Sequence, residues 1–358
     1  MAMSRKHYSD ELVLTAAELF LNGESAPEIK NKLNDRFGEQ ITREQVYVLM
    51  RVARERGMLQ VVGPQDASLE RDIAERFRCD AGGITVVCTD ADRTGGHVAA
   101  AAANAVLELL KIVAKKKRAG EVVGLGLGPG PTMLAACEAL GRLIGNDPEA
   151  PDSLKLFSLV CGTLAHRAKF EPTSFFNLFP ASHVRACVGM FAPIVVRQSE
   201  LEGLKTLPGV CEAFAERGEI DVVFASIGEL ADARSVIGKT FERSGRSLDF
   251  LDERGDFAGL ILHRPYSATG AVTQKGNQWR ALSLFEVAEL ASFAGNKDKY
   301  VVLVANQARE CGADISGELL PILANPKLRF WNRLVLDVAT ARGLLKRGNT
   351  AAGPVSDD

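Results

Sequence analysis

The sequence EVVGLGLGPGPTMLAACEAL occupies residues 121–140 and decides the fold of the larger part of the chain. An apolar, β-rich run at residues 121–128 is followed by a turn rich in glycine and proline, and a helical pattern then begins at Thr132. A buried strand that turns directly into a helix is the repeating unit of α/β domains. We therefore expect a parallel sheet whose strands alternate with helices.

The same alternation recurs on both sides of this stretch. Seven more apolar runs predict strands, at residues 84–89, 154–162, 186–196, 220–228, 280–285, 299–306 and 332–337. Helical patterns lie between several of them, at residues 99–117, 132–144, 207–217, 285–293 and 338–345. Because the strands are continuously apolar, we expect helices to cover both faces of a doubly wound, mostly parallel sheet.

The first sixty residues have a different organisation, with three short helical patterns that follow one another closely. The first pattern, at residues 10–21, is amphipathic. The second and third each begin with a hydroxyl residue followed three positions later by Glu or Gln, which is the capping-box sequence: Ser25 with Glu28, and Thr42 with Gln45. Three short helices with a tight middle connection are typical of a helix-turn-helix, whose last helix lies in the major groove of DNA.

The start of the third helix supplies the candidate DNA contacts: Thr42, Arg43, Glu44, Gln45, Tyr47 and Arg51. Arginine and glutamine make paired hydrogen bonds to guanine and adenine, and a helix N-terminus favours a phosphate. Residues 1–60 contain nine basic and nine acidic side chains, whereas residues 41–56 contain four arginines and two glutamates. A three-helix bundle that does not bind DNA remains the alternative for this segment.

The chain has 358 residues, 46% hydrophobic and 25% charged, which is typical of a globular chain of more than one domain. We expect a helix-turn-helix domain at residues 1–62, a helical linker at 63–83, an α/β domain at 84–347 and a disordered tail at 348–358. No apolar run approaches the length that spans a bilayer, and the polar start is no signal peptide. We therefore expect a cytoplasmic protein with no membrane partner.

The cysteines and histidines do not point to a metal or a disulfide framework. The five histidines are dispersed, and the seven cysteines occur singly, without a C-x-x-C pair. We expect buried free thiols, no metal site and no cofactor. The cysteines lie at positions 79, 88, 137, 161, 187, 211 and 311.

The glycine-rich loop is the main candidate for binding a small molecule, because ligands bind beyond the carboxyl ends of parallel strands. Gly126, Gly128 and Gly130 let backbone amides approach an anion, and Thr132 opens a helix N-terminus. The pattern is neither the dinucleotide fingerprint nor the Walker loop. Asp256, in a second loop at residues 255–259, offers a carboxylate for sugar hydroxyls. A tight turn without a ligand is the alternative for each loop.

Taken in order, these parts resemble the SorC/DeoR-type sugar-binding transcriptional regulators over nearly the whole chain. The resemblance rests on ARERGML at residues 53–59, the glycine loop ending in Thr132, Ala192-Pro193, DVVFASIG at 221–228, GDFAG at 255–259 and LDVATARGLL at 336–345. The family's Gly-Trp-Gly-Arg-Thr loop differs from this chain, where residues 126–132 contain neither tryptophan nor arginine.

The resemblance implies a sugar-isomerase-like Rossmann fold for the larger domain, a sugar or sugar-phosphate effector, and assembly into homodimers or homotetramers. The expected function is a regulator, not an enzyme, that binds double-stranded operator DNA under the control of a small-molecule effector. A sugar-phosphate isomerase or deaminase with a fused helical domain is the alternative, with Asp256 and His263 as its acid–base groups. A partner-binding protein that has lost DNA and ligand recognition is a third possibility.

Overall fold

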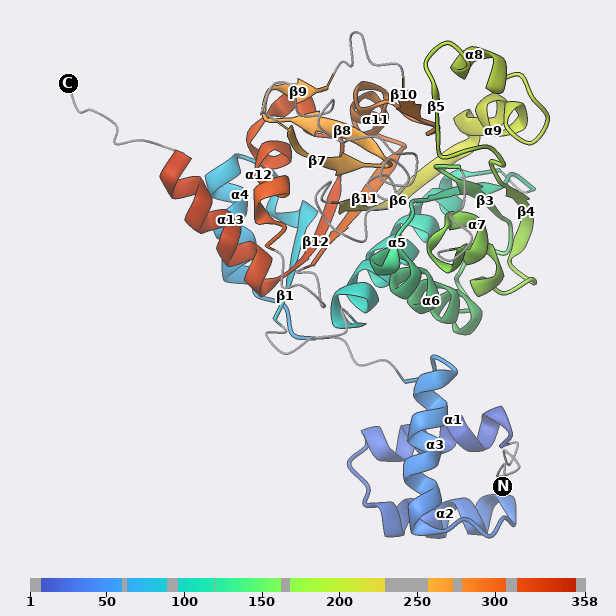
Figure 1. The fold of residues 1–358 in the computed structure, drawn as a ribbon. Helices are drawn as coiled ribbons and strands as arrows, with labels where there is room; N and C mark the ends of the chain where they lie inside the picture. The colour runs from blue at the N-terminus through green and yellow to red at the C-terminus, as the bar shows by residue number, and fades with distance from the viewer. Residues whose placement is uncertain are drawn as a thin grey trace. The chain divides into compact units, whose positions relative to one another are not determined.

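The computed structural model describes residues 8–59, 63–88, 96–118, 120–161, 168–228, 257–272, 279–306 and 314–351. The chain divides into two compact units, Met1–Val61 and Val62–Asp358. The smaller unit contains three helices (Figure 1): α1 (Asp10–Leu21), α2 (Ala26–Phe37) and α3 (Arg43–Glu55).

The three helices of the smaller unit pack around a single apolar core. Val13, Leu33 and Leu49, one from each helix, have no exposed surface. Both predicted capping boxes are present, at the starts of α2 and α3. They satisfy backbone N–H groups that a helix start otherwise leaves without partners.

The larger unit contains a ten-stranded sheet, of which seven strands are parallel. In spatial order these are β1 (Ile84–Val87), β12 (Arg333–Asp337), β11 (Tyr300–Ala305), β6 (Ile220–Gly228), β2 (Val123–Leu127), β3 (Leu154–Ser158) and β4 (Val184–Val188). The chain moves outward from β2 through β3 to β4, and in the opposite direction from β6 through β11 to β12. The strand order therefore reverses between β2 and β6, which is where such sheets bind their ligands.

Helices cover both faces of this sheet, as predicted for a doubly wound fold. Val222 and Phe224 of β6 pack into the core with α5 (Gly96–Lys116) and α6 (Pro131–Asn146). The alternate side chains Val223 and Ala225 pack on the opposite face. That face is covered by α4 (Ala67–Phe77), α11 (Val287–Ala294), α12 (Ser316–Ala324) and α13 (Val338–Ala351). Shorter elements complete the unit: α7 (Pro172–Phe175), α8 (Leu201–Leu204), α9 (Cys211–Glu216) and the antiparallel pair β5 (Val195–Arg197) and β10 (Trp279–Ala281).

An antiparallel branch leaves the end of β6, where the sequence predicted only a loop at residues 255–259. It consists of β7 (Phe257–Ile261), β8 (Arg264–Ser267) and β9 (Gly270–Ala271). The pairings of β6 with β2 and β11 end before Ile227, so its last two residues remain to pair with β7. This overhang of one long strand explains the branch. Asp256 precedes β7 and lies outside the described residues.

The segment expected to be a helical linker, residues 63–83, carries α4, which packs within the larger unit. α4 contacts α13 and β1. Its Glu70 carboxylate accepts a hydrogen bond from the backbone N–H of Val86 at 3.0 Å, and Arg76 donates to the carbonyl of Gly348. α13 continues to Ala351, so it includes the first residues of the stretch 348–358 that was expected to be a tail.

One described helix, α5, is long and apolar enough to cross a membrane by length and composition alone, contrary to the sequence expectation. Within its apolar window, 61% of the residues are buried in the protein. The central helix of an α/β domain meets the same criteria, because its apolar face packs on the sheet.

The cysteines only partly follow the expectation of buried thiols. All six described cysteines are free, but only Cys137 and Cys161 are buried. Cys187 is exposed on the edge strand β4, and three others are half-buried. Within the described parts of the chain, no group of three His, Cys, Asp or Glu side chains is placed to hold a metal ion.

Replacing Gly124 by alanine is expected to destabilise the sheet. A Cβ at this position would lie 2.1 Å from the carbonyl oxygen of Glu219 and 2.8 Å from the Cα of Ile220, both backbone atoms of the neighbouring chain segment. We expect Gly124→Ala to lower the free energy of unfolding by about 1–3 kcal/mol, measured by urea denaturation. The control is Gly218→Ala, because a Cβ there meets no atom within 4 Å. Equal denaturation midpoints for the two variants would contradict the close approach of β2 and β6.

Candidate functional site

The loop between β2 and α6 lies at the switch point of the sheet and is held from two sides. The N–H of Gly128 donates to the carbonyl of Phe224 in β6 at 2.8 Å. The N–H of Gly130 donates to the carbonyl of Phe170 at 2.8 Å. The glycines of this loop therefore use their amides to hold the loop in place.

This loop has fewer free backbone donors than its glycine content predicts. Residues 129 and 131 are prolines without an N–H group, and the amides of Gly128 and Gly130 already have carbonyl partners. Gly126 lies inside β2, where a Cβ would approach the side chain of Leu159 to 2.6 Å. Gly126 is therefore required for packing within the sheet, whereas Gly128 and Gly130 lie in the loop itself, with their amides bonded to the protein's own carbonyl groups.

Thr132, at the start of α6, connects two strand ends across the sheet. Its hydroxyl donates to the side-chain oxygen of Asn306 at 3.2 Å, and Asn306 directly follows β11. The structure thus brings Gly128, Gly130 and Thr132 together at the carboxyl edge.

His263, considered for acid–base chemistry, lies in the turn between β7 and β8. It adopts a positive φ of 63°, as does the preceding Leu262 at 48°. Burial lowers the pKa of the His263 imidazole to about 4, so the ring is neutral at pH 7. Because Asp256 lies outside the described residues, the structure does not place it relative to this ring.

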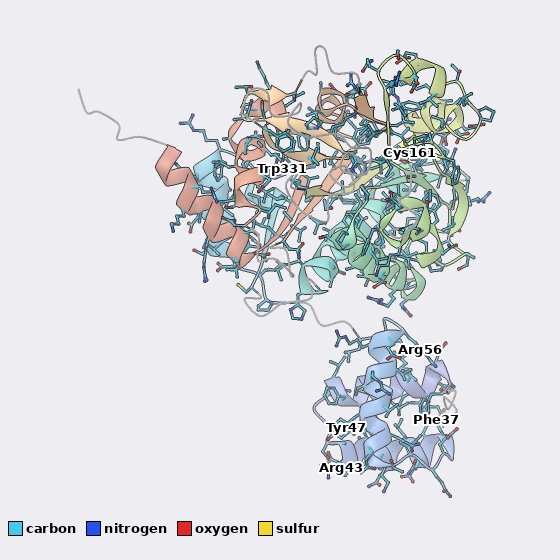
Figure 2. All side chains as sticks on the ribbon, in the orientation of Figure 1. Phe37, Arg43, Tyr47, Arg56, Cys161 and Trp331 are labelled. Carbon is cyan, nitrogen blue, oxygen red and sulfur yellow. The ribbon has the colours of Figure 1, made fainter. Side chains whose placement is uncertain are left out.

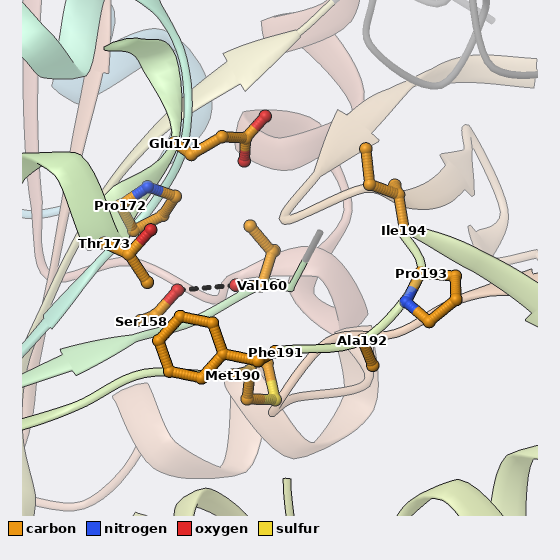
Figure 3. Close-up of a pocket in the computed structure, with 10 residues that line it drawn as sticks. All are labelled: Ser158, Val160, Glu171, Pro172, Thr173, Met190, Phe191, Ala192, Pro193 and Ile194. Carbon is orange, nitrogen blue, oxygen red and sulfur yellow. Dashed lines mark hydrogen bonds between the residues drawn. The ribbon is translucent and has the colours of Figure 1, made fainter. Parts of the chain in front are cut away.

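A cavity of about 450 Å³ opens at the carboxyl end of β3 (Figure 3). Glu171 is one of the lining residues, yet it is only 1% exposed to solvent and its carboxyl oxygens are buried. Neither of its carboxyl oxygens has a hydrogen-bond partner among the described residues. Phe170, which contacts the β2–α6 loop, is its neighbour in the chain, so the cavity adjoins that loop. The lining consists of Ser158, Val160, Glu171, Pro172, Thr173, Met190, Phe191, Ala192, Pro193 and Ile194.

Burial keeps the carboxyl group and the thiol beside this cavity in their neutral forms at pH 7. It raises the pKa of Glu171 to about 8, because the ionised carboxylate would lose its hydration without gaining a partner. Burial also raises the pKa of the nearby Cys161 thiol to about 12. Sequence reasoning did not identify Glu171, because one glutamate before a proline carries no sign of its burial.

A polar face of α3 carries most of the predicted DNA contacts. Thr42, Arg43, Glu44, Tyr47 and Arg51 are all exposed, and Tyr47 has 55% of its surface accessible. Figure 2 shows Arg43 and Tyr47 one turn apart on the helix. Arg54, which was not predicted, is also exposed and continues this row at helical spacing. The spacing of arginines along the helix was the available signal for it.

Two other polar residues of this helix have structural contacts. The side-chain oxygen of Gln45 accepts a hydrogen bond from the N–H of Thr42 at 2.8 Å, as part of the capping box. A paired contact from Gln45 to adenine would need this oxygen and would break the cap. Arg56 pairs with Asp10 at 2.5 Å and donates to the carbonyl of Tyr8, which ties the end of α3 to the start of α1.

The buried acid gives a testable pH dependence of stability. The pKa of Glu171 rises from about 4.5 in an exposed state to about 8 in the folded chain, so the folded chain binds the proton more tightly. Its stabilising contribution is complete below about pH 4.5 and disappears as the pH rises to about 8. Relative to Glu171→Gln, the free energy of unfolding of the wild type should therefore fall over this range, by at most about 1.4 kcal/mol per pH unit.

Urea denaturation of both proteins between pH 5 and 8 measures this difference. The lowered pKa of His263 has the opposite effect, because stability then rises with pH between about 4 and 6.5. That effect is common to both proteins and cancels in the comparison. Parallel stability curves would show that the Glu171 carboxyl group is not buried without a partner.

The comparisons with known proteins identify the fold. No protein-family model matches the chain, and no curated protein matches it. Solved structures do match. The chain is similar to the full-length sorbitol operon regulator SorC from Klebsiella pneumoniae, with a TM-score of 0.55 and 19% identity, over 95% of this chain and 100% of that one.

Two further structures match the larger part of the chain. A DeoR family transcriptional regulator from Listeria monocytogenes has a TM-score of 0.52 and 18% identity, over 76% of this chain and 97% of its own. A transcriptional regulator from Streptococcus pneumoniae has a TM-score of 0.54 and 14% identity, over 78% of this chain and 97% of its own. All three are described as regulators rather than enzymes. This chain therefore has the fold of the SorC/DeoR transcriptional regulators, as its sequence motifs predicted.

Proposed function

We propose that this chain is a transcriptional regulator that binds operator DNA under the control of a small-molecule effector. The observation that carries the proposal is the match to a full-length operon regulator over 95% of the chain, which includes most of both units. The capped and exposed start of α3 supports the DNA-binding part of the proposal. The switch point between β2 and β6 supports the effector-binding part.

In this proposal α3 is the recognition helix in the major groove. Arg43 and Tyr47 reach base edges from its first turns, where the Glu44 carboxylate can accept from the N4 amino group of a cytosine, while Thr42 lies at the helix start beside the DNA backbone. Arg51 and Arg54 extend the positive face along the helix. Gln45 keeps its capping role, and the arginines therefore provide the direct readout.

The effector binds at the carboxyl edge of the sheet, where Gly128, Gly130 and Thr132 lie, with Asp256 as a further candidate. A sugar or sugar phosphate is the class that the resemblance implies. The effector controls DNA binding if it has different affinities for two arrangements of a homodimer or homotetramer. Such a protein acts in the cytoplasm, where its operator is.

Binding of the purified full-length protein to the DNA upstream of its own gene tests the regulator. We expect a complex that forms in preference to nonspecific DNA and weakens as salt increases, because phosphate contacts release counterions. Electrophoretic or fluorescence titration over several salt concentrations measures both properties. A lack of preference, both without and with a panel of candidate effectors, would reject the proposal.

Replacing Arg43 by alanine should weaken operator binding by about 1–3 kcal/mol and relax the sequence preference at one base position. Arg36→Ala is the matched control, because Arg36 is exposed on α2 and carries the same charge, paired with Glu11 at 3.2 Å. The control should leave the sequence preference unchanged. Unchanged affinity and preference in Arg43→Ala would remove this residue from base readout.

A further inference from the structure

The two edges of the parallel sheet differ in whether the chain covers them. Beyond β1, the backbone of residues 64–66 adds to the sheet. The N–H of Asp66 donates to the carbonyl of Val86 at 2.9 Å, and the N–H of Cys88 donates to the carbonyl of Pro64 at 2.7 Å. An uncovered strand edge pairs readily with another chain, and proteins usually cover or blunt it. The β1 edge is thus covered by the protein itself.

The opposite edge, β4, is open. β4 is the last strand of the sheet, and within the described parts of the chain no strand pairs with its outer side (Figure 1). Three consecutive residues, Arg185, Ala186 and Cys187, are exposed to solvent. Apart from Arg185, at the bulge where the strand begins, β4 contains none of the charges or prolines that blunt such edges. The edge therefore has room for one more strand.

An exposed aromatic side chain lies at the end of this strand. Phe191 is 73% exposed, and its ring covers Gly189, where a Cβ would lie 2.8 Å from a ring carbon. The N–H of Phe191 donates to the carbonyl of Gly209 at 3.1 Å. The N–H of Gly209 in turn donates to the carboxylate of Glu212 at 2.8 Å. The end of β4 therefore carries an aromatic face with a carboxylate near it, whereas its start carries the guanidinium of Arg185.

These groups are complementary to those of a second copy. If two β4 strands pair antiparallel around a two-fold axis through Cys187, this residue faces its own copy and Arg185 faces the partner's Gly189. The guanidinium can then reach the ring that covers this glycine, with the carboxylate of Glu212 near it. A cation is attracted both by an aromatic face and by a carboxylate. An axis through Arg185 would instead bring two like charges together, which is unfavourable.

Flanking apolar residues enlarge the surface. A stable interface buries about 800 Å² on each partner, which is more than one five-residue strand provides. The larger unit has three large apolar side chains that are exposed among its described residues: Ile112, Phe191 and Leu207. Two of them lie here, because Leu207 is close in the chain to Gly209, which contacts Phe191. Exposed apolar surface is therefore concentrated beside the open edge.

We propose that this chain forms a homodimer in which the β4 strands of two copies pair antiparallel around Cys187 and join the two sheets into one. A two-fold interface uses the same surface on both copies, so the pairing ends at two. The inference rests on the proposed function in that it names an interface of the oligomer whose arrangements the effector would select. The strand pairing itself requires neither DNA nor effector.

Charges placed on the axis provide the test, in the full-length protein without DNA or effector. Light scattering and sedimentation measure the mass, and we expect a wild-type dimer, or a tetramer built from such dimers. Cys187→Glu and Cys187→Lys each bring two like charges together and should raise the dissociation constant about tenfold or more, which lowers the mass. An equal mixture of the two variants should recover the wild-type mass, because opposite charges then meet.

Two control variants separate charge on the axis from other effects. Cys187→Ser keeps a small neutral side chain and should keep the wild-type mass. Ala215→Glu adds a charge at an exposed position of α9 and should also leave the mass unchanged. Circular dichroism shows whether each variant is folded. A short bismaleimide should link two wild-type chains but not two Cys187→Ser chains, and this measurement does not depend on the charged variants.

A double-mutant cycle tests the register of the two strands. Arg185→Ala and Phe191→Ala should each weaken the dimer about fivefold or more. The double variant should be weakened by less than the product of the two effects, because each single change already removes the contact between them. Effects that simply multiply would reject this register.

The outcomes separate this inference from the proposed function. A monomeric wild type, or charged variants that keep the wild-type mass, would overturn the inference. If such a protein still selects its operator, the regulator stands. A dimer that depends on charge at Cys187, in a protein that does not select an operator, would support the interface and reject the regulator.

Discussion

The close approach of β2 and β6 is the constraint on which the rest of the larger unit depends. Backbone meets backbone at Gly124, where a Cβ would lie 2.1 Å from a carbonyl oxygen. The buried carboxylate of Asp221 accepts the N–H of Gly124 at 2.9 Å and pairs with Lys117 at 2.8 Å and Lys299 at 3.1 Å. These contacts join the two half-sheets and tie them to the end of α5 and the start of β11. The close packing of β2 on the β6 segment fixes the position of the switch point and of the loop that leads to Thr132.

Much of the fold was predictable from the sequence, because it depends on local patterns. Apolar runs marked all seven parallel strands, and the two capping boxes marked the starts of α2 and α3. The strand order was not predictable, since β1 pairs with β12 far along the chain. The hairpin β7–β8 was missed for a related reason. It depends on the overhanging end of β6, which becomes visible only when the neighbouring strands are in register.

The candidate site was less predictable than the fold. The glycine loop was found, but its sequence could not separate a ligand cradle from a tightly packed turn. Gly126 is needed for the contact with Leu159, and Gly130 donates its amide to Phe170. No sequence pattern marked Glu171. It stands out only through its burial and through the absence of a hydrogen-bond partner among the described residues. Chemistry that depends on what surrounds a side chain requires the three-dimensional structure.

The pairing of β1 with β12 has a consequence for the synthesis of the protein. The ribosome makes β1 from residue 84 onward, but it makes the partner strand β12 only about 250 residues later. At typical ribosomal speeds this separation corresponds to roughly 12–50 s, during which the apolar strand and α4 have neither β12 nor α13 to cover them. The smaller unit, with its own core, can fold in that interval. During most of its elongation the nascent chain therefore combines a folded smaller unit with apolar elements of the larger unit that still lack their partners, and these elements are then open to binding by chaperones.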